Sequence, residues 1–129
     1  MKKKLRGKIQ KLWEAGKFKK VQKELSQPLK DGDLEARYLR AHFSLGKISE
    51  EEQSANLIAE LKDLSRLGYL DAVRELAWCF RHGDDVQKDE EIFALLIGFA
   101  ASEGHEKSKE DLDNQVEMLV DSDFSSRVK

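Results

Sequence analysis

Apolar residues recur every three or four positions along most of the chain, which is the spacing of amphipathic helices. The pattern is clear in residues 5–13, 18–25, 34–45, 57–67, 72–80 and 92–101. No alternating apolar run of strand length interrupts it, and the chain contains one proline. The pattern therefore predicts an all-α fold of about seven helices.

Three glycines, Gly32, Gly68 and Gly104, stand 36 residues apart. A small side chain follows each of them four residues later, at Ala36, Ala72 and Ser108. Such a period is typical of an α-solenoid of antiparallel helix pairs, because one pair cannot bury its own apolar face. We therefore predict one helical-repeat domain over residues 1–120, followed by a polar tail at 121–129. Its predicted parts are pairs at about 3–30, 33–67 and 70–103 and a capping helix at 106–120.

Start and stop signals locate several helix ends. Gly16 should end the first helix after Ala15, and Pro28 with Asp31-Gly32 should end the second. Asp33 is an N-cap candidate for a helix that runs to Gly46. Ser49 and Glu52 match a capping box at the start of the fourth helix.

The segment from Ile92 to Ala101 is apolar on nearly every side. A helix of this kind is normally buried. We therefore expect it to be covered by the helix pairs on both sides.

Charge is distributed unevenly along the chain. Residues 1–30 hold 11 Lys/Arg against 2 Glu, and residues 31–129 hold 12 Lys/Arg against 23 Asp/Glu. Because apolar residues recur at helical spacing through the basic segment, we interpret its lysines as the solvated face of an amphipathic helix. An RNA- or DNA-binding arm formed by residues 2–23 is the alternative.

Other features of composition bear on location. Cys79 is the single cysteine, so an internal disulfide is impossible, and the first 25 residues lack the apolar core of a signal peptide. No stretch approaches the roughly 20 apolar residues of a membrane span. We expect a cytoplasmic protein without membrane contact.

The clearest repeat resembles the Sel-one-like repeat, a relative of the tetratricopeptide repeat. The matching positions are Ala72, Leu76-Ala77, Phe80, Gly83, Asp85-Val86, Asp89, Ala100-Ala101 and Gly104. The chain departs from the family pattern at Ala77 and Asp85, where glycine is usual, and at Phe93, where alanine is usual. The resemblance implies a right-handed superhelix with a concave groove that binds proteins, and it implies no catalysis or cofactor.

The repeat register of that family places particular residues in the groove. They are Tyr38, His42, Leu45, Arg74, Trp78, Arg81 and His82. Tryptophan and arginine dominate binding hot spots, so Trp78 is the main candidate for an anchor. The alternative is that Trp78 packs against the neighbouring helix.

Catalytic and metal-binding interpretations are weaker. His42, His82 and His105 lack zinc-ligand spacing. Cys79 and His82 share a helical face, yet a free cysteine in a helical core usually acts as a small apolar residue. The acidic residues 84–91 lack the ligand order of a calcium loop. We expect a protein that is not an enzyme and that uses no metal, cofactor or small-molecule substrate.

The combination of a short helical array and an acidic body resembles bacterial immunity proteins of contact-dependent toxin systems. The resemblance implies one protein partner, a basic toxin domain such as a nuclease, whose active site this chain would block. Acidic residues near the groove would meet its Lys and Arg side chains. These acidic residues are Glu35, Asp71, Glu75, Asp84, Asp85 and Asp89. An adaptor that joins cellular proteins and an RNA-associated protein are the alternatives.

Overall fold

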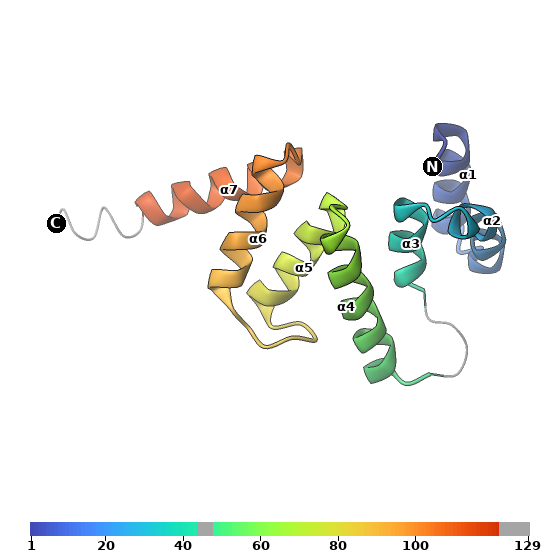
Figure 1. The fold of residues 1–129 in the computed structure, drawn as a ribbon, viewed down its shortest axis with the longest axis horizontal. Helices are drawn as coiled ribbons and strands as arrows, with labels where there is room; N and C mark the ends of the chain where they lie inside the picture. Colours follow the sequence, from blue (N-terminus) through green and yellow to red (C-terminus); the bar gives the residue numbers. More distant parts are fainter. Residues whose placement is uncertain (44–47, 122–129) are drawn as a thin grey trace. The chain divides into compact units, whose positions relative to one another are not determined.

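The computed structural model describes residues 1–43 and 48–121, and these residues form seven helices and no strand (Figure 1). The helices are α1 (Lys3–Glu14), α2 (Phe18–Lys30), α3 (Leu34–Ala41), α4 (Glu50–Arg66), α5 (Leu70–His82), α6 (Glu90–Ser102) and α7 (Glu106–Leu119). The all-α prediction is confirmed. Among the described residues, no helix has the length and apolar content needed to cross a membrane.

The chain divides into two compact units, unit 1 (Met1–Leu64) and unit 2 (Ser65–Lys129). In unit 1, α2 packs against both α1 and α3. In unit 2, α6 packs against both α5 and α7. Contacts between successive helices agree with a stacked array. The superhelical path and the single-domain organisation stay predictions.

The three periodic glycines occupy equivalent turns. Gly32, Gly68 and Gly104 each lie two residues after a helix end, with φ of 76°, 84° and 97°. The N–H of each donates to the carbonyl three residues earlier, at 3.1, 3.0 and 3.1 Å. Glycine adopts this left-handed conformation without steric cost, which is why it ends helices so often. The small residues four positions later are all 0% exposed. The 36-residue spacing therefore marks one repeated helix–turn–helix connection.

Helix starts follow the sequence signals closely. Asp33 Oδ1 accepts a hydrogen bond from the Ala36 N–H at 2.8 Å, and Ser49 Oγ accepts one from the Glu52 N–H at 3.1 Å. Each bond satisfies a backbone donor that has no partner within the helix. Both predicted N-caps are confirmed.

Helix α2 ends at Lys30, before Asp31-Gly32, as predicted, but the stop signal at Pro28 and the predicted end of the third helix are wrong. Pro28 lies inside α2, which continues to Lys30, because the φ of proline suits a helix and its ring removes only one N–H donor. Helix α3 ends at Ala41 instead of continuing to Gly46. The His42 ring Nδ1 lies 2.8 Å from the Tyr38 carbonyl and replaces the backbone partner of a continued helix. The predicted positions Leu45 and Gly46 fall outside the described residues.

The core of unit 1 joins its first three helices. Its buried residues are Ile9, Val21, Leu25, Ala36 and Phe43. At one side the Trp13 ring lies 4.8 Å from the Phe43 ring and 5.9 Å from the Phe18 ring, measured between centroids. The apolar side chains of α1 and α2 therefore pack in the interior of unit 1.

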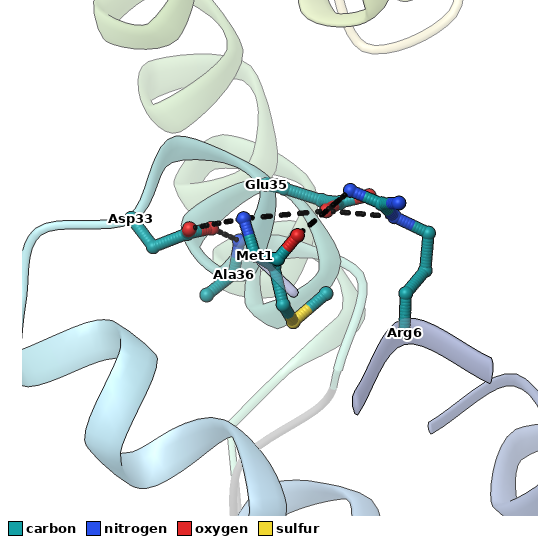
Figure 2. A network of polar contacts seen from close by, with 5 residues as sticks. All are labelled: Met1, Arg6, Asp33, Glu35 and Ala36. Carbon is teal, nitrogen blue, oxygen red and sulfur yellow. Dashed lines mark hydrogen bonds and ion pairs between the residues drawn. The ribbon is translucent and has the colours of Figure 1, made fainter. Parts of the chain in front are cut away.

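Polar contacts fix α1 and the residues before it to the start of α3. Arg6 Nε lies 2.7 Å and Arg6 Nη2 2.8 Å from the two carboxylate oxygens of Glu35, which is a bidentate pair (Figure 2). The amino group of Met1 lies 2.7 Å from Asp33 Oδ2. Burial alone would raise the pKa of Asp33, but hydrogen bonds from that amino group and from Ala36 outweigh it, so the pKa is lowered.

Candidate functional site

Helix α6 exposes two large apolar side chains on one face. Leu95 is 73% exposed and Phe99 is 46% exposed, whereas Phe93 and Ile97 on the opposite face are buried. Residues four positions apart lie on the same side of a helix, so Leu95 and Phe99 form one surface. The expectation that this helix is covered on both sides is therefore wrong.

A pocket of about 260 Å³ opens between α6 and its two neighbours, and neither Leu95 nor Phe99 lines it. Its lining residues are Arg81, Glu90, Glu91, Phe93, Ala94, Gln115 and Leu119. Arg81 Nη1 donates to Gln115 Oε1 at 2.7 Å, and its guanidinium lies 5.1 Å from the centre of the Phe93 ring. The pocket thus has an apolar wall and one cation held in place.

The turn between α5 and α6 carries an acidic edge, which we define as Asp84, Asp85, Glu90 and Glu91. All four are exposed, and no ion pair joins them to a cation in the described part of the chain. The turn is closed by two backbone bonds of 2.9 Å, from Asp84 N–H to the Cys79 carbonyl and from Asp89 N–H to the Phe80 carbonyl. The edge, the pocket and the Leu95–Phe99 face together are called the α6 surface below.

The conformation of this turn depends on Gly83. Its φ is +73°, and a Cβ added there would lie 3.2 Å from Lys88 Cβ. Asp89 begins α6 as its N-cap, with Oδ1 accepting from the Ile92 N–H at 3.0 Å. Asp89 was predicted to bind a partner, and in the structure its carboxylate serves the helix start.

Cys79 lies beside this turn. Burial raises the pKa of its thiol to about 11, and the negative charges of Glu75, Asp84 and Asp85 add to the effect. A thiol with a raised pKa is a poor nucleophile at neutral pH. The surroundings of Cys79 therefore fit its interpretation as a small apolar residue rather than a nucleophile.

The predicted groove residues of α5 contact α7. Asp111 Oδ2 accepts from Arg74 Nε at 2.6 Å and from Trp78 Nε1 at 3.2 Å. The Trp78 ring also packs on Phe93, with centroids 4.9 Å apart, and stacks with His82 at 5.5 Å. The sequence left Trp78 open between an anchor and a packing residue, and its contacts are those of a packing residue.

Asp71, one of the two predicted acidic residues of α5, belongs to a chain of three hydrogen-bonded side chains. His105 Nε2 lies 2.7 Å from Asp71 Oδ1, and His105 Nδ1 lies 2.7 Å from Ser108 Oγ. An aspartate, a histidine and a serine are the residue types of a hydrolase triad. Ser108 is 0% exposed, however, so its hydroxyl oxygen cannot contact a substrate. The arrangement joins α5 to α7 and satisfies a buried hydroxyl. Sequence reasoning missed it because Asp71 and His105 are 34 residues apart.

Three predicted residues belong to unit 1. Glu35 is paired with Arg6, as described above. Tyr38 and His42 contact each other, with ring centroids 4.9 Å apart. The other nine, from Asp71 to Asp89, belong to unit 2. Their use by a partner stays a prediction.

Within the described residues, no group of three or more His, Cys, Asp and Glu side chains could hold a metal ion. Comparison of the chain with protein-family models, with curated proteins and with solved structures finds no match. The candidate site therefore stands on its own geometry.

Proposed function

We propose that the chain is a non-catalytic protein-binding module that docks a basic protein on the α6 surface. The observation that carries the proposal is the exposure of Leu95 and Phe99 on a helix whose other side is fully packed. Exposed apolar side chains that gather on one surface are typical of protein interaction sites.

The other parts of the α6 surface have the composition of an interface. Interfaces combine apolar anchors with a polar rim, and pockets accept anchoring side chains of the partner. Here the pocket beside α6 offers Phe93 and Leu119 as apolar walls, and Glu90 and Glu91 stand at its edge. An apolar side chain of the partner would fill the pocket, while Leu95 and Phe99 would lose their contact with water.

The charge of unit 2 favours a basic partner. Residues 65–129 contain 8 Lys/Arg and 15 Asp/Glu, a net charge of −7. The acidic edge has no ion-pair partner within the described residues, so its field is available to a positively charged surface. Such complementarity speeds association and selects against acidic partners.

An immunity protein is the specific form of module that we favour. It would bind one basic toxin domain tightly and block that domain's active site without chemistry of its own. An adaptor would instead bind several proteins more weakly through the same surface. Coexpression separates the two, because only an immunity protein restores growth to cells that produce its bound protein in toxic form.

The proposal is tested by replacing both exposed side chains together, as Leu95→Ser with Phe99→Ser. Proteins captured on the purified chain are identified, produced separately and returned to binding measurements. We expect a basic protein whose Kd for the double variant rises at least about 30-fold, since truncation of interface anchors costs about 2 kcal/mol or more.

Leu67→Ser is the matched control, because Leu67 is also exposed and belongs neither to α6 nor to the pocket lining. It should leave the Kd unchanged. Equal affinity of wild type and double variant for every captured protein would refute the proposed surface.

A further inference from the structure

Unit 1 presents a surface of lysines on its first two helices, which we call the lysine face. It comprises Lys4, Lys8 and Lys11 of α1, Lys20 of α2 and Lys17 just before α2. Lys8 Nζ lies 2.9 Å from Glu24 Oε1, so these two positions meet across the helix pair. Lys4 and Lys11 share the side of Lys8 on α1, and Lys17 and Lys20 share the side of Glu24. Five lysines therefore lie on the side of the helix pair where Lys8 meets Glu24.

Most of these charges have no partner. Lys4, Lys11, Lys17 and Lys20 are exposed, and within the described residues none of them makes an ion pair. Arg6 and Arg37 differ, because Arg6 pairs with Glu35 and Arg37 pairs with Glu60. A solvated face normally mixes both signs of charge, whereas this face concentrates one. Its lysines repel one another unless a polyanion lies over them.

We propose that the lysine face binds the phosphodiester backbone of nucleic acid without reading its sequence. Lys4, Lys8 and Lys11 extend over about 10 Å of helix, a length in which one strand of a duplex carries about three phosphates. Lysine is a point charge suited to phosphate. Arg6, the arginine of α1, could read base edges but is already held by the carboxylate of Glu35.

Two other polyanionic partners fit the observations less well. An anionic membrane is bound by helices that insert an apolar face. Here that face is used in the core, since Ile9, Val21 and Leu25 are at most 2% exposed. Among the described residues of unit 1, Phe18, at 47%, is the one exposed large apolar side chain. An acidic protein is less suited because lysine is depleted at protein–protein interfaces.

Fluorescence anisotropy with labelled RNA and duplex DNA of about 20 units tests this proposal. With about five phosphate contacts, log K should fall with log salt at a slope near −4.5 for duplex DNA and −3.5 for single strands. The triple variant Lys4→Gln, Lys11→Gln, Lys20→Gln should reduce that slope by about 2 to 3.

Two matched variants separate a site from a general charge effect. Lys62→Gln, Lys88→Gln, Lys107→Gln removes the same net charge from exposed lysines elsewhere and should keep the wild-type slope. Lys4→Arg, Lys11→Arg, Lys20→Arg keeps the cations and should also bind like wild type. Circular dichroism confirms that each variant is folded.

The outcomes divide clearly. A reduced salt slope found only in the variant Lys4→Gln, Lys11→Gln, Lys20→Gln supports the proposal. An equal reduction of the slope in the two triple Lys→Gln variants overturns the proposal. Undetectable binding of both RNA and duplex DNA at about 50 mM salt also overturns it. Binding only to vesicles of phosphatidylcholine with about 30% phosphatidylserine overturns it in favour of a membrane.

Discussion

At the scale of single residues, Cys79 shows how the acidic turn changes a neighbouring group. Burial raises the pKa of the Cys79 thiol from 9.0 to about 11, with smaller contributions from Glu75, Asp84 and Asp85. The unfolded chain therefore releases this proton at lower pH than the folded chain. The stabilising effect is complete below pH 9 and is lost as pH rises towards 11.

The rate of alkylation by iodoacetamide measures this shift. In the folded protein the rate should rise with a midpoint near pH 11, and in denaturant near pH 9. Two pKa units lower the thiolate fraction at pH 8 roughly a hundredfold. A folded-state midpoint at or below pH 9 would contradict the raised pKa of Cys79.

Asp111 of α7 joins this helix to α5 through side-chain hydrogen bonds. It is 12% exposed and accepts from both Arg74 and Trp78. Asp111→Asn should lower the free energy of unfolding by about 2 kcal/mol, because the amide keeps one acceptor oxygen but removes the charge that pairs with Arg74 and replaces the other oxygen with an NH2 donor. Urea denaturation measures the change. Asp113→Asn, at an exposed site on the same helix, should stay within about 0.5 kcal/mol of wild type.

At the scale of helices and turns, the periodic glycines define the architecture. Each of Gly32, Gly68 and Gly104 has positive φ, and nothing lies within 4 Å of an added Cβ. Replacing any of them by alanine should therefore cost about 1 kcal/mol through backbone strain alone. The three costs should be similar because the turns are equivalent.

Gly98→Ala is the control for that series. Gly98 lies inside α6, and an added Cβ there also has nothing within 4 Å. Alanine should stabilise the helix by about 0.5–1 kcal/mol. Thermal or urea unfolding gives all four values, and stabilisation by alanine at Gly68 would contradict the left-handed turn.

Much of the fold could be predicted from these local signals, and much of the site could not. Glycine turns, the Asp33 cap and the Ser49 cap depend on neighbouring residues, so the sequence is sufficient for them. The sequence shows that residues 92–101 are apolar, but it cannot show which face of this helix packs against another helix. Leu95 was therefore expected to be buried.

The contacts that occupy the predicted groove were missed for a related reason. Arg74 meets Asp111 over 37 residues, and Arg81 meets Gln115 over 34 residues. Both separations are close to the 36-residue repeat. Pairs of oppositely charged or hydrogen-bonding residues about one repeat apart in the sequence could therefore have predicted these contacts. Stacked repeats place equivalent helices next to each other, which brings such residues together.

At the scale of the whole molecule, the two compact units carry opposite charge. Residues 1–64 hold 15 Lys/Arg against 10 Asp/Glu, a net +5, whereas residues 65–129 have a net −7. The total of −2 conceals this division. Partners of opposite charge are therefore expected at the two units, a polyanion at the lysine face and a basic protein at the α6 surface.

An NMR titration of the isotope-labelled chain with its purified protein partner tests the central claim most directly. We predict that chemical-shift changes concentrate at residues 84–99, including the methyl groups of Leu95, and that the lysine face of unit 1 changes little. Changes confined to residues 1–30, with an unaltered α6, would contradict the account.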